Sequence, residues 1–270
     1  MSLASTRDGR AWVLDQVNAR MVRVGRDGVV DARAHVALRA AQDVATGADG
    51  SVAVLDRLGD RAIALYDRDG NARGRVALGT RAGESGGVTG LFVERDGVYV
   101  EREHGPLVRV ADEEGHALEG DAGEADEAPG RPTRDGRSYV SATLADRATG
   151  RIALSAWERP GATLRYTRVL PLGNAVRTLV LLDSDRAGVV YLGALGEFGA
   201  VSDPASGERA LAVKLLCVEP VTGRVTGQNT LPASEGPEES FREFSVLDDG
   251  GVLYLRRTGE GAAVEAWSCR

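Results

Sequence analysis

Three carboxylates occupy the same place in a repeated pattern, each six residues after a turn glycine: Asp15, Asp56 and Glu103. Converging carboxylates are typical ligands of Ca²⁺, which takes six to eight oxygen atoms. The same side chains suit a structural role, because each acid could accept backbone N–H groups of the next turn or pair with Arg20 or Arg61. The structural interpretation predicts no cofactor, and calcium is the alternative.

Glu103 is followed directly by His104, a pair that suits general acid–base chemistry. The alternative for His104 is a solvated loop residue. A zinc site needs three or four converging ligands, and His35, His104 and His116 fall at different positions of the repeat. Gly83-Glu84-Ser85-Gly86-Gly87 has the spacing G-x-S-x-G, but it opens no helix as a nucleophile elbow would, and we interpret it as a flexible loop. The sequence has no phosphate-binding loop and no C-x-x-C motif. Glu103 and His104 are therefore the candidate catalytic residues.

These residues lie in a chain punctuated by Asp-Gly turns. Aspartate hydrogen-bonds the backbone of its own turn and glycine adopts positive φ, so the pair favours a tight hairpin. Short apolar strands follow the first turn of each repeat, whose glycines are Gly9, Gly50, Gly97, Gly136, Gly188 and Gly250. Turn-separated strands that repeat every 40 to 50 residues are typical of a β-propeller.

We therefore predict an all-β fold, a six-bladed β-propeller of four-stranded antiparallel blades. The predicted blades span approximately 1–40, 41–80, 86–120, 128–172, 175–232 and 240–270. The alternatives are a two-sheet sandwich or two small β domains. The last blade ends one strand early, because Ser2–Thr6 already serves the first blade. We expect either a three-stranded blade or a natural chain that extends before Met1, with a removed signal segment and a periplasmic or cell-surface location.

Segment 13–28 resembles the NHL repeat, in which V-x-D-x-x-N-x-R precedes an apolar strand and a D-G turn. The matching residues are Val13, Asp15, Asn18 and Arg20. The second repeat keeps the aspartate and the arginine, and the later repeats keep only the order of strands and turns. The resemblance implies a six-bladed propeller that serves as a binding platform. It also implies an alternative, since some related propellers are calcium- or zinc-dependent hydrolases or lyases of the gluconolactonase-like or amidating-lyase-like type.

The long connections of the predicted propeller lie opposite the Asp-Gly turns and are rich in acids. Long loops on a rigid scaffold commonly carry function. The candidate binding residues are Glu119, Asp121, Glu124, Asp126, Glu127, Glu197, Asp203, Glu235, Glu238 and Glu239. We predict a non-enzymatic module that presents this acidic face to a protein or peptide partner of basic character. The alternative is a merely solvated acidic rim.

The composition narrows the classes of partner. A net charge of −7 argues against a general nucleic-acid surface. No apolar stretch approaches the ~20 residues that a membrane helix needs. We therefore expect no nucleic acid, no membrane span and a monomer. Cys217 and Cys269 could pair or remain two buried thiols, and the sequence does not decide between these alternatives.

Overall fold

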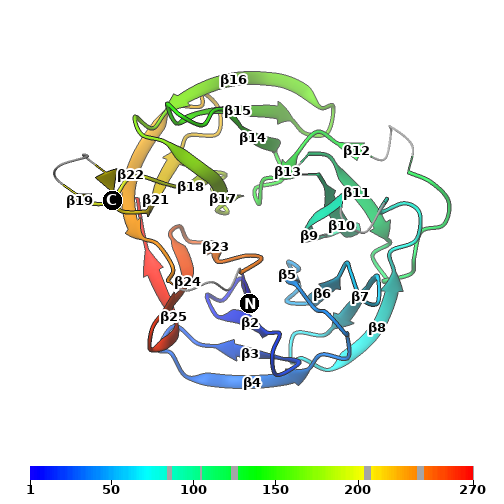
Figure 1. Ribbon diagram of the computed structural model, residues 1–270. Coiled ribbons are helices and arrows are strands. Elements are labelled where there is room, and N and C mark those ends of the chain that lie inside the picture. Colours follow the sequence, from blue (N-terminus) through cyan, green and yellow to red (C-terminus); the bar gives the residue numbers. More distant parts are fainter. Residues whose placement is uncertain (84–86, 104, 123–126, 204–207, 236–239, 270) are drawn as a thin grey trace. The chain divides into compact units, whose positions relative to one another are not determined.

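The computed structural model describes residues 1–83, 87–103, 105–122, 127–203, 208–235 and 240–269. These residues form antiparallel β-sheets joined by turns and loops, and no α-helix occurs among them. Within this part of the chain, consequently, there is no helix that could cross a membrane. Figure 1 traces the strands in chain order.

The strands form six successive blades. Blade 1 contains β1 (Ser2–Ser5), β2 (Ala11–Asp15), β3 (Arg20–Val24) and β4 (Val30–His35). Blade 2 contains β5 (Asp43–Thr46), β6 (Val52–Asp56), β7 (Ala62–Tyr66) and β8 (Ala72–Ala77). Blade 3 contains β9 (Val88–Glu94), β10 (Gly97–Arg102), β11 (Leu107–Ala111) and β12 (Glu127–Ala128).

Blade 4 contains β13 (Arg131–Pro132), β14 (Ser138–Asp146), β15 (Arg151–Glu158) and β16 (Thr163–Pro171). Blade 5 contains β17 (Val176–Ser184), β18 (Val190–Gly196), β21 (Ala212–Val218) and β22 (Val225–Pro232), with an inserted hairpin of β19 (Val201–Asp203) and β20 (Glu208–Arg209). Blade 6 contains β23 (Phe244–Val246), β24 (Val252–Thr258) and β25 (Gly261–Trp267). This series confirms the predicted fold class, a six-bladed β-propeller whose last blade has three strands.

Blade 3 extends further along the chain than the predicted end at residue 120. Among the described residues, its outer edge has two pieces, and the first consists of Ala117 and Leu118, which bond β11 just after the second turn. The second piece is β12, whose Ala128 pairs with Leu107. Glu119 and Asp121, called here the acidic segment of unit 1, therefore lie between the two pieces of the outer edge.

The blades belong to two compact units. Unit 1 comprises Met1–Ala128 and the segment Glu238–Glu243, and it holds blades 1 to 3. Unit 2 comprises Pro129–Pro237 and Phe244–Arg270, and it holds blades 4 to 6. In each blade, the hairpins between the first and second strands and between the third and fourth strands share one end of the sheet, here called the turn side. The other end is called the loop side.

The Asp-Gly turns have the predicted chemistry. In blade 2, the Asp49 carboxylate accepts the backbone N–H of Ser51 at 3.0 Å. Gly50 and Gly70 adopt φ values of +88° and +87°, which an L side chain would strain. These turns are closed by the backbone bonds from Gly47 to Ser51 and from Asp67 to Asn71, at 2.8 and 2.9 Å. They hold the strands in fixed register, so equivalent residues of neighbouring blades take equivalent places.

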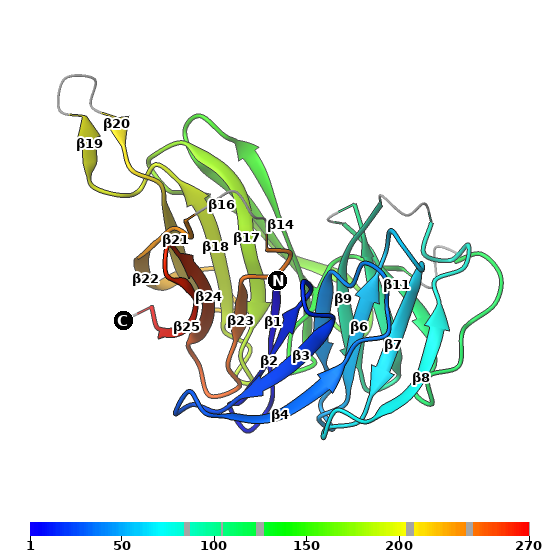
Figure 2. The same cartoon turned by 60° about the horizontal axis from the view of Figure 1, so that its bottom comes forward.

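The core of unit 1 lies between its successive blades. The β6 strand is buried along its whole length because sheets cover both of its faces (Figure 2). Outer strands are mostly exposed and contribute single inward residues, such as Val76 of β8. The two apolar clusters of this unit centre on Trp12 and Met21 between blades 1 and 2, and on Leu55 and Leu91 between blades 2 and 3.

Unit 2 also has apolar clusters between its successive blades. In addition, a charged side chain connects these blades by hydrogen bonds. Arg134, in the first turn of blade 4, donates to Asp183 of β17 at 2.8 Å and to Asp248 of the blade 6 turn at 2.9 Å. Burial alone would lower the pKa of the Arg134 guanidinium, but the two carboxylates outweigh it and raise that pKa. One arginine therefore joins all three blades of this unit through charged hydrogen bonds.

Cys217 and Cys269, whose pairing the sequence did not decide, form a disulfide. Cys217 of β21 and Cys269, just beyond β25, are joined across a Cα–Cα distance of 6.0 Å. The Asn229 side chain of β22 donates to the Ser268 carbonyl at 2.8 Å. The end of blade 6 is thereby fixed to blade 5 by a covalent bond and a hydrogen bond.

Candidate functional site

Two of the three predicted metal ligands are engaged in turns. The Asp15 carboxylate accepts hydrogen bonds from the Asn18 amide at 2.7 Å and from Arg20 Nε at 2.9 Å. Burial acts to raise the pKa of Asp15, but these bonds prevail and lower it. Asn18 and Arg20 are the residues that carried the repeat resemblance, and they hold Asp15 in place as the structural interpretation expects.

Asp56 makes the same kind of contact with the backbone alone. Its carboxylate is fully buried and accepts N–H groups from Ala40, Leu58, Gly59 and Asp60 at 2.6 to 3.1 Å. Burial alone would raise the pKa of Asp56, but the four donors outweigh it and lower it. A carboxylate with this many donors has few lone pairs left for a cation.

The third predicted ligand lies in a different environment. Glu103 is exposed in the turn between β10 and β11, at a positive φ of 49°, and its N–H donates to the Gly87 carbonyl at 2.7 Å. His104, its predicted catalytic companion, lies outside the described residues. Among the described residues, Asp15, Asp56 and Glu103 do not gather into one ligand group. Their role as a metal or catalytic set stays a prediction.

The predicted acidic residues divide between the units. Glu119, Asp121 and Glu127 belong to unit 1, and Glu197, Asp203 and Glu235 belong to unit 2. Glu124, Asp126, Glu238 and Glu239 lie outside the described residues. Glu119, Asp121, Glu197 and Glu235 are exposed. Glu127 pairs with Arg102 at 3.1 Å, and Glu235 lies 3.9 Å from Arg256, so these two are partly neutralised.

A buried arginine organises the acidic segment of unit 1. The Arg81 residue is only 9% exposed, and its Nε donates to the Arg109 carbonyl of β11 at 3.0 Å. Its Nη1 donates to the main-chain carbonyls of Glu119 and Asp121, both at 3.4 Å. The contacts involve only the backbone of the two acids, so the segment is fixed while both acidic residues stay exposed.

A cleft of unit 1 lies on its turn side, which the sequence did not single out. It has a volume of about 700 Å³ and lies between blades 2 and 3. Ala53, Leu65 and Val93 supply apolar lining, and charged residues of the blade 3 turn 112–116 form part of its rim. A cleft of this volume is within the range of small-molecule sites, roughly 300 to 1,000 Å³.

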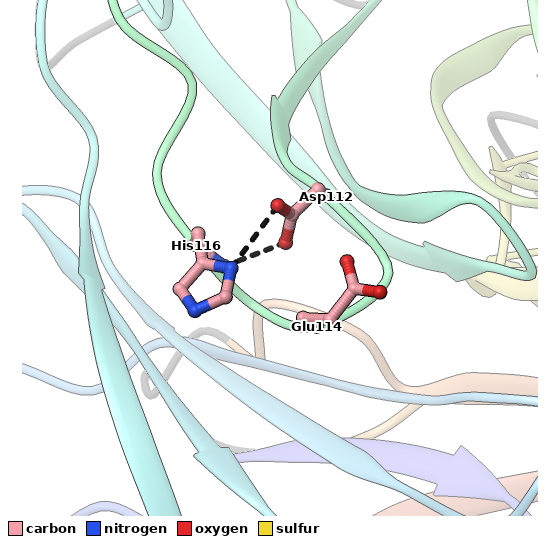
Figure 3. Close-up of side chains that lie close together, drawn as sticks. All are labelled: Asp112, Glu114 and His116. Atoms are coloured by element: carbon pink, nitrogen blue, oxygen red, sulfur yellow. Dashed lines mark hydrogen bonds and ion pairs between the residues drawn. The ribbon is translucent and has the colours of Figure 1, made fainter.

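Three polar side chains of the blade 3 turn, Asp112, Glu114 and His116, lie on this rim with potential ligand atoms within 4.8 Å of one another (Figure 3). The Asp112 carboxylate accepts the backbone N–H of His116 at 2.7 Å, and its other oxygen lies 3.2 Å from His116 Nδ1. The backbone bond from His116 is the main reason that the pKa of Asp112 is lowered.

The equivalent turn of blade 2 explains this cluster. There the Asp67 carboxylate accepts the Asn71 backbone N–H at 2.8 Å and the Asn71 side-chain amide at 2.9 Å. His116 therefore takes the place of an asparagine that closes the same turn. The sequence interpretation looked for convergence among the histidines; the spacing D-E-E-G-H is the local signal that places His116 beside an acid.

Comparison with known proteins supports the fold and goes no further. No protein-family model and no curated protein matches the chain. Among solved structures, hydrazine synthase of Kuenenia stuttgartiensis is similar over 100% of this chain and 96% of its own, with 10% identity and a TM-score of 0.58. The WD40 repeats of RRP9 are similar over 100% of this chain and 79% of their own, with 11% identity and a TM-score of 0.57.

A streptogramin B lyase is similar over 94% of this chain and 89% of its own, with 10% identity and a TM-score of 0.48. At such low identity, the first two likenesses concern the fold alone, because one propeller scaffold hosts many unrelated functions.

Proposed function

We propose that this protein is a non-enzymatic binding module that presents the acidic segment of unit 1 to a basic protein or peptide. The observation that carries the proposal is the Arg81 contact with the main chain of Glu119 and Asp121. A surface fixed before binding loses less conformational entropy when a partner arrives. The segment is thus held in position while its acidic residues face solvent.

The neighbouring arginines on the loop side support the same proposal. Arg57 donates to the Val88 carbonyl at 2.6 Å, and Arg61 donates to the Gly83 carbonyl at 2.8 Å. The guanidinium groups of Arg57 and Arg61 are directed to backbone carbonyls, and among the described residues no ion pair involves Glu119 or Asp121. The carboxylates of Glu119 and Asp121 therefore remain available to cations of a partner.

Exposed apolar side chains add a second element to this surface. Val17 is 87% exposed and Leu58 is 55% exposed, and both lie at the tips of equivalent hairpins on the loop side of unit 1. Large aliphatic side chains at such tips offer contact area that polar turns do not. We infer that the partner combines basic residues with apolar ones.

The test uses a fluorescent peptide of alternating arginine and leucine, titrated with the whole protein and followed by anisotropy. Glu119→Lys with Asp121→Lys is expected to weaken binding about tenfold, since each exposed ion pair contributes up to ~1 kcal/mol. The same change is expected to flatten the salt dependence of the affinity. The matched control, Glu113→Lys with Glu114→Lys on the turn side, is expected to bind like the parent protein. Equal weakening by both double variants would show general charge attraction and overturn the proposal.

The disulfide supports an extracytosolic location, because disulfides persist mainly in oxidising compartments. We therefore propose that the protein works outside the reducing cytosol, and as a monomer. Thiol titration of protein from its native source, under denaturing conditions without reductant, tests the location. Two free thiols per chain would contradict it.

A further inference from the structure

The junction between blades 1 and 2 is closed by one indole ring. Trp12 of β2 is fully buried, and the blade 2 turn at Gly70 lies directly against it. A Cβ added at Gly70 would lie 3.0 Å from the Trp12 ring. The Arg23 guanidinium stacks over the ring at 5.4 Å from its centre. The indole thus fills the space between a strand and the next blade's turn.

The junction between blades 2 and 3 has the same strand pairing and the same covering turn, but it has no tryptophan ring. Trp12 pairs with Arg23 across β2 and β3, and Ala53 pairs with Leu65 across β6 and β7 in the same register. The next turn again covers the pair, since a Cβ added at Gly115 would lie 2.6 Å from Leu65. Ala53 therefore stands where blade 1 has tryptophan, and the cleft of about 700 Å³ lies at this place.

The outer strand of blade 2, β8, also differs from that of blade 1, because it has Gly74 at the cleft where β4 has Ala32. Gly74 pairs with Leu65, as Ala32 pairs with Arg23 in blade 1. A Cβ added at Gly74 would meet nothing within 4 Å. The side chains of Ala53 and Gly74 are both too small to fill the space that Leu65 borders, so the cleft is a direct result of these residue types.

At one position of the cleft edge, blade 2 has a positively charged residue where blade 1 has a negatively charged one. Asp31, next to Ala32, pairs with Arg23 at 2.7 Å and with Arg10 at 2.8 Å. The equivalent residue of blade 2 is Arg73, next to Gly74. In blade 2, Leu65 stands at the position of Arg23, and Ser51 stands at the position of Arg10. Both residues are uncharged.

Arg73 is exposed and lines the cleft together with Asp49. Burial acts to raise the pKa of Asp49, but hydrogen bonds from Ser51 and the charge of Arg73 lower it. Arg73 therefore places a cation where the closed junction has a carboxylate.

We propose that this cleft binds a flat aromatic ring that carries a carboxylate. The ring lies in the cleft beside Ala53, Leu65 and Gly74, since Leu65 itself already contacts the turn at Gly115. The carboxylate pairs with Arg73 in the geometry that guanidinium groups favour. The site lies on the turn side of unit 1, so it is independent of the acidic loop-side segment and of its proposed partner.

The test titrates the whole protein with indole-3-acetate, indole and tryptamine, followed by ligand-observed NMR. Indole-3-acetate is expected to bind about tenfold more tightly than indole, as expected for a charged hydrogen bond of ~1.5 kcal/mol. Tryptamine is included because Glu113 and Glu114 also line the cleft. Equal or tighter binding of the amine, or no saturable binding of the acid, would overturn the proposal.

Two variants place the ligand in the cleft. Gly74→Leu fills the cleft from an exposed strand position and is expected to weaken indole-3-acetate binding at least about tenfold. Arg73→Gln is expected to reduce indole-3-acetate to the affinity of indole while leaving indole itself unchanged. Gly259→Leu is the matched control, because a Cβ there also meets nothing within 4 Å, and it is expected to have no effect. Unchanged binding in folded Gly74→Leu, verified by its urea unfolding curve, contradicts the assignment.

A fourth probe distinguishes the source of the ring. N-acetyl-tryptophan imitates the carboxyl-terminal aromatic residue of a peptide, whereas indole-3-acetate imitates a free aromatic acid. Tighter binding of the first supports the terminus of a partner chain as the natural ligand, and tighter binding of the second supports a small metabolite. Both outcomes support the site, and both are expected to depend on Arg73.

Discussion

Arg242 donates through Nη2 to the Asp43 carboxylate at 2.7 Å, across a sequence separation of 199 residues. The same nitrogen donates to the Leu91 carbonyl at 2.8 Å, and the Arg242 carbonyl accepts the backbone N–H of Leu3 at 2.9 Å. Asp43 itself is fully buried and also accepts the Ser2 hydroxyl at 2.8 Å. One late segment therefore bonds the first strand of every blade in unit 1.

Removing the arginine from this link is expected to destabilise unit 1 strongly. Arg242→Met leaves the Asp43 carboxylate buried without its cation, a change that typically costs about 3 to 5 kcal/mol. Urea unfolding gives the loss directly. Arg39→Met is the matched control: Arg39 is largely exposed and lies 3.5 Å from Asp60, so a loss of at most about 1 kcal/mol is expected. Similar losses in the two variants would show that the ion pair with Asp43 stabilises the fold no more than an exposed ion pair does.

The disulfide of unit 2 leads to a second prediction. It closes a loop of 52 residues, and in the chain-entropy description such a cross-link stabilises the folded state by up to about 4 kcal/mol. Cys217→Ser and Cys269→Ser are each expected to lower the unfolding free energy by about 2 to 4 kcal/mol. The double variant is expected to lose no more than either single variant, because both remove one bond. Additive losses would contradict the disulfide, and thermal unfolding with and without reductant provides the same comparison.

Two aspartates predict opposite effects of pH on stability. Burial is the main reason that the pKa of Asp185 is raised, against hydrogen bonds that include the Tyr191 hydroxyl at 3.2 Å. The folded state thus holds the Asp185 proton more tightly than the unfolded chain. Its contribution is fully present below the ordinary aspartate pKa of about 3.9 and is lost as the pH rises through the raised value.

Asp185→Asn removes this titration, so its stability relative to the parent protein is expected to rise with pH across that window. Asp56 has a lowered pKa, and its contribution is present above about pH 3.9 and lost as the pH falls through the lowered value. Asp56→Asn is therefore expected to lose stability relative to the parent protein at neutral pH and to approach it in acid. Urea midpoints measured from pH 3 to 8 test both signs, and parallel curves for the two variants would contradict the assignment.

How far the sequence predicted these features depends on the range of the interactions. Asp49 and Gly50 specify their turn locally, which is why the blades and their order were predicted. The predicted end of blade 3 was wrong because Ala128 pairs with Leu107, although the two residues are far apart in the sequence. Nothing near Asp43 in the sequence indicates Arg242. The cleft, in contrast, has a visible signal, since aligning the repeats places Ala53 beneath Trp12.

The last prediction concerns metal. Asp56 receives four backbone N–H groups, and Asp15 is bonded to Asn18 and Arg20, so these carboxylates are expected to bind no divalent cation. Protein dialysed against buffered calcium or zinc is expected to retain less than one equivalent by elemental mass spectrometry. Should one equivalent remain, Asp56→Asn and Asp112→Asn locate it. Loss of metal only in Asp56→Asn would contradict the structural role of Asp56 and revive the hydrolase or lyase alternative, with Glu103 and His104 as its catalytic candidates. Loss only in Asp112→Asn would place the ion at the blade 3 turn and contradict a purely turn-closing role for His116.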